Sequence, residues 1–155
     1  MDIRRATEAD AAEAAEVLRR SIAELCRADH HDDPAILTGW LANKTPETVA
    51  AWIADPDTVV MVAVDATGAI AGVGAAAGSG EITLNYVSPA FRLRGISRAM
   101  VARLEQHLAD LGRRRAVLTS TATAHRFYLS AGYLDDGPPK PWPGGSIHPM
   151  AKELG

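Results

Sequence analysis

The pattern of apolar and polar positions first indicates a strand and a long helix in the middle of the chain. Ile82, Leu84 and Tyr86 alternate with Thr83 and Asn85, which predicts a strand. Proline cannot donate to a strand ladder, so the Ser88–Pro89 pair should end it. Apolar residues then recur at helical spacing, which predicts one buried stripe. These residues are Ile96, Met100, Leu104, Leu108 and Leu111.

The N-terminal third predicts a short strand followed by three helices. Ile3 to Ala6 is a plausible strand, and Thr7–Asp10 is typical of a helix start with acidic residues in its first turn. The helix that follows should fade near Arg27. A second helix is expected over Pro34–Leu41, and Thr45–Pro46 is typical of the cap and first residue of a third.

Two more strands precede the central one, and another follows the long helix. Thr58 to Val64 is a β-branched run, Asp65–Gly68 is a turn, and Ala69 to Ala77 resumes as a strand of small residues. Together with the central strand they predict an antiparallel meander. Ala116–Thr119 is reached through the long helix, so it should be a strand parallel to the central one.

The last 33 residues predict a helix, a loop and a final strand. Thr123 to Ala131 is the expected helix, and Gly132 ends it. The proline- and glycine-rich stretch from Gly137 to Gly145 is expected to be a loop, and Ile147 to Leu154 can return as a strand.

Composition narrows the class of protein. The chain has 155 residues, 47% hydrophobic and 23% charged, which fits one soluble domain. A net charge of −3 argues against non-specific nucleic-acid binding, and no apolar run is long enough for a membrane span. Cys26 is the only cysteine, so an intrachain disulfide is impossible, and we interpret it as a small core residue. We expect a cytoplasmic protein.

The start of the long helix is a candidate anion site. The first N–H groups of a helix lack internal partners, and the helix dipole places partial positive charge there. Gly95 allows close approach of a ligand, and Ser97 keeps the first turn uncrowded. Arg92, Arg94 and Arg98 add positive charge, so a pyrophosphate would fit. The alternative is a glycine-containing loop with solvated arginines.

Two motifs resemble those of the GNAT acetyltransferase superfamily. Val87-x-Pro89 followed by Arg92-x-x-Gly95-x-Ser97 resembles its acetyl-CoA motif. The segment from Ala124 through Phe127–Tyr128 to Gly132–Tyr133 resembles its later signature. The resemblance implies an α+β, three-layer fold: a central mixed, mostly antiparallel sheet of six to seven strands with helices on both faces. Within one domain, residues 8–55 would form an acceptor-side helical segment, 57–135 the acetyl-CoA core, and 136–155 a tail loop and terminal strand.

The resemblance also implies the site. The central strand and Ala116–Thr119 would splay apart, and the pantetheine arm of acetyl-CoA would lie between them, paired with a strand edge. A backbone N–H near the thioester could polarise its carbonyl. The implied cofactor-binding residues are Asn85, Tyr86, Val87, Arg92, Leu93, Arg94, Gly95, Ile96, Ser97, Arg98, Thr121, Thr123 and Phe127. The two threonines stand near the place of an asparagine common in the family.

Two catalytic residues are implied. Tyr128 matches the family's tyrosine beside the sulfur, as general acid or hydrogen-bond donor; the alternative is an aromatic that only packs. Glu81 matches, by position alone, the base of the histone-acetyltransferase branch. Because an ordinary glutamate is too weak a base for an ammonium group, this role requires burial or a water relay. The alternative is a solvated glutamate.

The expected function is transfer of an acetyl group from acetyl-CoA to a primary amine of a small molecule or peptide. The rival is a catalytically silent acyl-CoA sensor. The acceptor should contact the segment from His30 to Trp52 and the tail around Trp142, where acidic residues weakly favour a cationic acceptor. Two histidines that titrate there could matter to the amine. Dimerisation is common in the family, so a homodimer is possible.

No metal is expected. The run from His30 to Asp33 lacks the spacing of a defined site, and we interpret it as a loop at the substrate entrance. The basic run Arg113–Arg115 is either a solvated turn or a contact to the ligand's distal phosphate.

Overall fold

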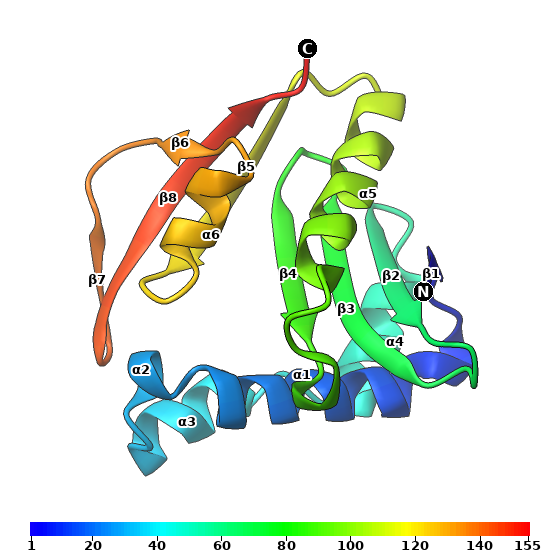
Figure 1. Cartoon of the computed structure of the whole chain (residues 1–155), viewed down its shortest axis with the longest axis horizontal. Coiled ribbons are helices and arrows are strands. Elements are labelled where there is room, and N and C mark those ends of the chain that lie inside the picture. Colours follow the sequence, from blue (N-terminus) through cyan, green and yellow to red (C-terminus); the bar gives the residue numbers. More distant parts are fainter.

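The computed structural model describes all residues from Met1 to Gly155 and contains two four-stranded sheets (Figure 1). The first has the order β1-β2-β3-β4, with every neighbouring pair antiparallel. Its strands are β1 (Asp2–Arg5), β2 (Thr58–Val64), β3 (Ile70–Ala77) and β4 (Ile82–Val87). In the second sheet β8 pairs with all three others. Its strands are β5 (Arg115–Thr121), β6 (Leu134–Asp135), β7 (Lys140–Trp142) and β8 (Gly145–Glu153).

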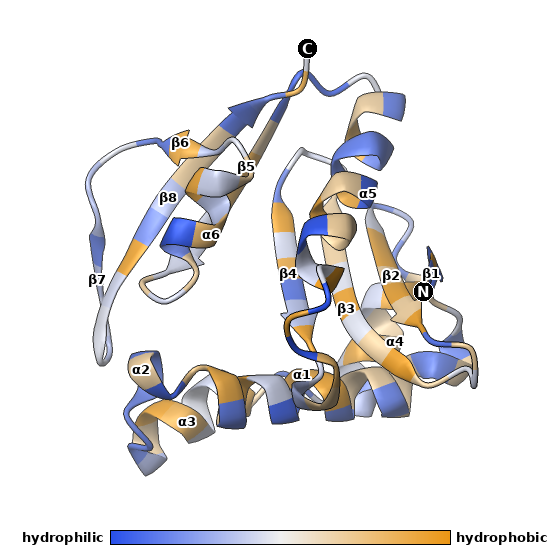
Figure 2. Ribbon diagram, in the orientation of Figure 1, coloured by the Kyte–Doolittle hydropathy of each residue, from blue (hydrophilic) through white to orange (hydrophobic).

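Helices cover both faces of the first sheet. The six α-helices are α1 (Ala11–Leu25), α2 (Arg27–His30), α3 (Pro34–Leu41), α4 (Pro46–Ala54), α5 (Ile96–Asp110) and α6 (His125–Ser130). One core lies between α5 and the sheets, and a second lies between the first sheet and helices α1 and α4. Burial from both sides explains why β2 is apolar along nearly its whole length (Figure 2). No helix combines the length and hydropathy that crossing a membrane requires.

Glycines in β3 bring α5 close to the sheet. A Cβ at Gly74 would lie 2.5 Å from Met100 Cγ, and one at Gly72 would lie 2.9 Å from Ile96 Cγ2. Both distances are too short for a side chain. The absence of side chains at these positions therefore fixes the height of α5 above the sheet, and with it the position of the helix start.

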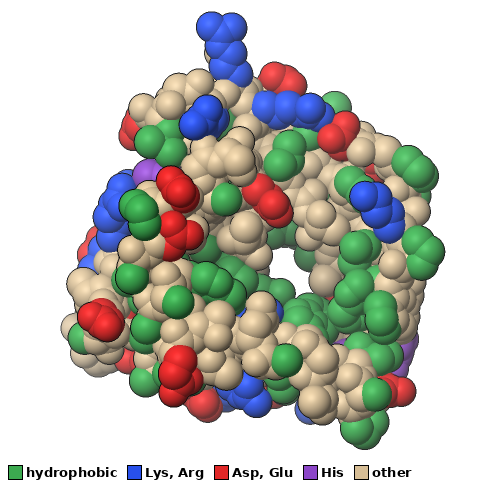
Figure 3. Space-filling view, turned by 180° about the vertical axis from the view of Figure 1, so that it is seen from behind, with side chains coloured by type: hydrophobic (Ala, Val, Ile, Leu, Met, Phe, Trp, Pro, Cys, Tyr) green, Lys and Arg blue, Asp and Glu red, His purple; other side chains and the backbone are tan.

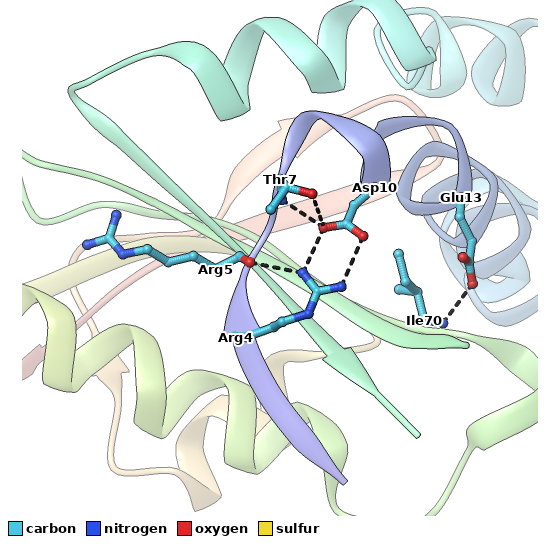
Figure 4. Close-up of polar contacts among 6 residues, drawn as sticks. All are labelled: Arg4, Arg5, Thr7, Asp10, Glu13 and Ile70. Carbon is cyan, nitrogen blue, oxygen red and sulfur yellow. Dashed lines mark hydrogen bonds and ion pairs between the residues drawn. The ribbon is translucent and has the colours of Figure 1, made fainter. Parts of the chain in front are cut away.

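A polar cluster joins the first strand to the first helix (Figure 4). Asp10 Oδ2 accepts hydrogen bonds from the Thr7 backbone N–H at 2.7 Å and from Arg4 Nη1 at 2.8 Å. Glu13 Oε2 accepts from the Ile70 backbone N–H at 2.7 Å. The start of α1 is thereby tied to β1 and β3.

The two sheets meet at one point and then diverge. The only pairing between them is a parallel bridge between Glu81, which directly precedes β4, and Val117 of β5, and Val117 N donates to Gly80 O at 3.0 Å. Beyond it the strands part, and Figure 3 shows an opening between the two halves seen from behind. The prediction that these strands splay apart is confirmed.

Most predicted elements are present, with three omissions. The helix over Pro34–Leu41 and the strand over Thr58–Val64 have the predicted bounds. The prediction missed α2, β6 and β7, and β7 lies inside the stretch expected to be a loop. The strands therefore number eight in two sheets, whereas six to seven in one central sheet were expected. The fold class, mixed α and β with mostly antiparallel strands, is confirmed.

Candidate active site

The edge of β4 facing the gap offers free backbone groups. Ser88 N donates to Ala71 O on β3, and hydrogen-bonded pairs alternate along an antiparallel ladder, so Tyr86 and Leu84 also bond to β3. The N–H and C=O groups of Asn85 and Val87 must then point toward β5. The exposed edge expected for a pantetheine arm is thus present in the structure.

Two cavities meet beside this edge. The inner cavity, of about 190 Å³, lies between β4, β5 and the start of α6 and includes Asn85, Cys26 and Tyr128 in its wall. The outer cavity, of about 590 Å³, lies between α3, β5 and the tail. Tyr86, Thr119 and Thr121 line both. A group in one cavity can therefore reach a group in the other.

Asn85 and Tyr128 face each other across the gap. Asn85 Nδ2 donates to the Tyr128 hydroxyl oxygen at 3.2 Å, and Asn85 Oδ1 is buried without a partner. Because the hydroxyl oxygen accepts this bond, its own hydrogen remains available to a ligand. Burial raises the pKa of Tyr128, although the Asn85 bond lowers it in part. The phenol therefore stays protonated near neutral pH and can act as a proton donor.

The loop before α5 presents free amides. None of the backbone N–H groups from Arg92 to Arg98 donates to an acceptor in the protein. Leu93 has φ of 62° and is 94% exposed, and Gly95 has φ of 75°. Left-handed residues of this kind turn successive amides toward a common point, as in anion-binding loops. These residues, with Val87 and Phe127, surround a hollow of about 350 Å³ that suits a pyrophosphate.

Two of the other side chains predicted to bind the cofactor, Arg98 and Thr121, make hydrogen bonds within the protein. Arg98 Nη2 donates to Ser130 Oγ at 2.7 Å, and its guanidinium lies 5.6 Å from the Phe127 ring centre, so it ties α5 to α6. Thr121 Oγ1 accepts from Ala124 N at 3.2 Å. Thr123 lines the inner cavity.

Glu81 lies at the closed end of the gap. It is exposed, its backbone forms the bridge to Val117, and it lines neither cavity. The burial that would let Glu81 act directly as a base is absent, and a relay through water stays a prediction.

The stretch around α2 differs from the expected entrance loop. His30 is fully buried, its Nε2 donating to Ile22 O at 2.9 Å and its Nδ1 accepting from Asp32 N at 3.0 Å. Both ring nitrogens are thus occupied within the interior, and the expectation that His30 belongs to a loop at the substrate entrance is wrong. Burial and, to a smaller extent, the charge of Asp29 raise the pKa of the Cys26 thiol to about 12, so the thiol is protonated near neutral pH and is a poor nucleophile.

Asp29 is a residue that sequence reasoning missed. It is 4% exposed; its Oδ1 accepts from Thr123 N at 3.2 Å, and its Oδ2 has no partner. An ordinary aspartate near the end of a helical pattern carries no signal in the sequence, because its burial depends on Thr123.

A second group missed from sequence is the cluster of His125, Asp135 and His148, whose ligand-type atoms lie within 4.8 Å of one another. His125 Nε2 is 2.7 Å from Asp135 Oδ1, and the two imidazoles stack with centres 4.1 Å apart. Ile147 lines the outer cavity, so its neighbour His148 points to the opposite face of β8. None of the three residues lines either cavity.

Comparisons with known proteins agree with this geometry. The model of an acetyltransferase (GNAT) domain matches residues 27–154. A GCN5-related N-acetyltransferase from Rhodopseudomonas palustris has a TM-score of 0.85 at 20% identity, covering 98% of this chain and 94% of that one. The PaiA N-acetyltransferase of Thermoplasma acidophilum, solved with coenzyme A, has a TM-score of 0.79 at 18% identity, covering 98% of both chains.

An aminoglycoside 6'-N-acetyltransferase complexed with coenzyme A has a TM-score of 0.72 at 17% identity, covering 99% of this chain and 97% of that one. At these identities the solved structures establish the fold. No curated protein sequence matches the chain.

Proposed function

This chain belongs to the acetyltransferase (GNAT) family, and from that premise we propose that it transfers an acetyl group from acetyl-CoA to a primary amine by direct attack on the thioester. The observation that carries the proposal is the parted pair of strands, whose free edge at Asn85 and Val87 lines the inner cavity. An extended ligand with amide groups can pair with such an edge as an added strand would.

The residues present fit coenzyme A. The unpartnered amides from Arg92 to Arg98 would bind its pyrophosphate, with Arg92 and Arg94 adding charge. The buried, unpartnered Asn85 Oδ1 needs a donor, which an amide N–H of the pantetheine arm can supply. Bound acetyl-CoA supplies an activated acyl thioester.

The chain's own residues would then stabilise the thioester carbonyl during attack and protonate the leaving sulfur. A backbone N–H of β4 facing the gap, at Asn85 or Val87, would stabilise negative charge on the carbonyl oxygen during attack. The Tyr128 hydroxyl, oriented by Asn85, would donate its proton to the leaving sulfur. Since Glu81 lines neither cavity, we assign it no step.

Turnover of acetyl-CoA with a panel of primary amines tests this proposal. Thiol release and the mass of the acetylated amine are measured together, so that hydrolysis of the thioester is distinguished from transfer. We expect at least one amine to be acetylated with release of one thiol per product. Tight binding of acetyl-CoA without transfer to any amine would favour the rival, a silent acyl-CoA sensor.

A further inference from the structure

The walls of both cavities lack a charged side chain. Neither the outer nor the inner cavity is lined by an Asp, Glu, Lys, Arg or His. The outer cavity, of about 590 Å³, is within the usual size range of small-molecule sites. Its wall is formed mainly by apolar and aromatic side chains, among them Ile36, Trp40, Tyr86, Trp142 and Ile147. An acceptor in this cavity therefore meets no opposite charge.

Three groups in the two walls can ionise, and none of them is charged near neutral pH. Burial raises the pKa of the Cys26 thiol to about 12, and burial also raises the pKa values of the Tyr86 and Tyr128 hydroxyls. All three groups therefore keep their proton near neutral pH. None of them can accept another proton from an ammonium group.

The charged side chains nearest the outer cavity lie behind its wall and make their hydrogen bonds there. Asp29 is buried and accepts from Thr123 N, and Asp33 Oδ1 accepts from two backbone N–H groups in the first turn of α3. Lys44 Nζ donates to Asn43 Oδ1 at 2.6 Å. The other titratable side chains on the elements around this cavity are also absent from its wall: Arg27, His30, His31, Asp32, Lys140 and His148.

An ammonium group would lose hydration in the outer cavity without gaining a carboxylate partner. The Thr119 hydroxyl can accept a bond from it, but an uncharged acceptor does not offset the lost hydration of a cation. The face of a tryptophan ring attracts a cation by less than an ammonium group loses on leaving water. The Trp40 and Trp142 rings are in contact edge to face, with centres 5.0 Å apart, so together they form one apolar surface.

We propose, on the basis of the proposed function, that the acceptor is a primary amine of low basicity on an apolar body, and that its nitrogen enters the site uncharged. Aromatic amines, and amines beside an electron-withdrawing group, belong to this class. The apolar body packs on the surface that Trp40 and Trp142 form together. The nitrogen lies beside Tyr86, which lines both cavities.

A neutral nitrogen needs no base in the wall. Its lone pair attacks the thioester carbon, a C–N bond forms, and the C–S bond breaks with its electron pair going to sulfur. The Tyr128 hydroxyl gives its proton to the sulfur, and the proton that the nitrogen loses replaces it. The step therefore balances without an external proton acceptor.

The charge of the reacting nitrogen is tested with wild-type protein and two acceptors of nearly the same shape, 2-phenylethylamine and 2,2-difluoro-2-phenylethylamine. The two fluorines make the nitrogen much less basic. The ratio of the two kcat/KM values is measured from pH 8 to pH 9, because effects of pH on the protein cancel in it. We expect the ratio of fluorinated to plain amine to fall about tenfold over this unit, as the neutral fraction of 2-phenylethylamine rises.

A constant ratio would mean that the protein takes the proton from a bound ammonium group, and would overturn the inference. A higher kcat/KM for spermidine or kanamycin than for the fluorinated amine would overturn it as well. Either result leaves the proposed function intact. No transfer to any amine would overturn both.

The place of the acceptor is tested with Gly39→Leu. Gly39 lines the outer cavity, and a Cβ there meets no atom within 4 Å, so the leucine side chain can extend into the cavity. Leucine also favours a helix more than glycine does, so α3 should fold. We expect KM for the fluorinated amine to rise about tenfold, with the Kd for coenzyme A unchanged.

Thr38→Leu is the matched control, because Thr38 is exposed on the same helix and lines neither cavity. It should leave KM and Kd at their wild-type values. Trp142→Ala, which removes half of the apolar surface, should raise KM as Gly39→Leu does. Wild-type KM values in both Gly39→Leu and Trp142→Ala would overturn the inference, and so would a raised Kd for coenzyme A in Gly39→Leu.

Discussion

Two tyrosines in the same core show how hydrogen bonding separates a chemical role from a structural one. Tyr128 accepts a bond from Asn85 and keeps its own hydrogen free, whereas the Tyr133 hydroxyl donates to Glu105 Oε2 at 2.7 Å. Their rings lie 5.7 Å apart. Only Tyr128 lines the inner cavity. The two residues therefore form a matched pair for mutation.

Tyr128→Phe should lower kcat about ten- to a hundredfold, because the leaving sulfur loses its proton donor. The Kd for coenzyme A should change little. Tyr133→Phe should leave kcat near the wild-type value and lower the free energy of unfolding by about 1–2 kcal/mol, because Glu105 loses a buried partner. Steady-state kinetics and urea denaturation measure both. Equal kcat in wild type and Tyr128→Phe would contradict the assigned role.

Asp10→Asn should reduce stability in a way that depends on pH. The hydrogen-bonded Arg4 guanidinium lowers the pKa of Asp10 from 3.8 to about 2, so the ionised form stabilises the fold above pH 3.8, and this contribution is lost as the pH falls through about 2. Allowing for the exposure of Arg4, we expect Asp10→Asn to lower the free energy of unfolding by about 1–2 kcal/mol at pH 7 and to change it little near pH 2. Urea denaturation at both pH values measures the loss; Asp57→Asn is the control. Equal changes in the free energy of unfolding for Asp10→Asn and Asp57→Asn would contradict the contribution assigned to the Asp10–Arg4 pair.

At the residue scale, the sequence reveals residues that belong to a motif. It does not reveal residues whose burial depends on a contact with a part of the chain far away in sequence. Tyr128 was predicted from its motif, and the structure places it in the cavity wall. Asp29 could not be predicted, because its burial depends on a partner 94 positions away. Glu81 was selected by position alone, and position does not report burial.

At the element scale, the start of α5 and the loop before it form a preorganised anion site. Gly72 and Gly74 set the height of the helix, and the left-handed residues Leu93 and Gly95 turn the amides outward. Arg94 lies over the Phe91 ring at 5.2 Å, so it is held near the loop. The basic run Arg113–Arg115 follows the other end of α5. There Arg113 Nε donates to the backbone carbonyl Gly78 O at 2.7 Å.

The double substitution Arg92→Ala, Arg94→Ala should raise the Kd for coenzyme A about ten- to a hundredfold, because two charges near the pyrophosphate are lost. The effect should shrink at high salt. Arg113→Ala is the matched control and should leave the Kd unchanged. Isothermal titration at low and high salt measures this. A larger effect of Arg113→Ala would instead support the distal-phosphate contact considered for that run.

Gly144→Ala should disturb the tail without affecting the cofactor. Gly144 has φ of 93°, and a Cβ there would collide with the Asp29 carbonyl oxygen. The tail would shift away from α2, and Trp142 with it. We expect a several-fold higher KM for the amine and an unchanged Kd for coenzyme A; Gly145→Ala, where a Cβ meets open space, is the control. Equal KM values in the two variants would contradict the contact.

Elements with a long periodic pattern were predicted well, and short ones were missed for a physical reason. α3 and β2 have their own pattern and caps, such as Asp33 at the start of α3. β6 and β7 contain two and three residues and exist because they pair with β8. Pro141 inside β7 argues against a strand when the sequence is considered alone.

At the scale of the whole molecule, two sheets joined at one bridge leave an open edge on each side of the gap. Periodicity predicted the strands, but the parting of β4 and β5 followed only from the family resemblance, because no local pattern specifies which neighbour a strand lacks. The central claim is that this gap, with the amides before α5, binds the acyl thioester that the enzyme uses.

Hydrogen exchange at the backbone amides of β4 tests that claim most directly. In the free protein the amides of Asn85 and Val87 should exchange quickly, while those of Leu84 and Tyr86, bonded to β3, should be protected. Saturating coenzyme A should slow exchange at Asn85 or Val87 by a factor of ten or more relative to Tyr86, measured by NMR on the labelled chain. If neither amide is slowed relative to Tyr86, or if both are already protected without ligand, the gap is not the cofactor site.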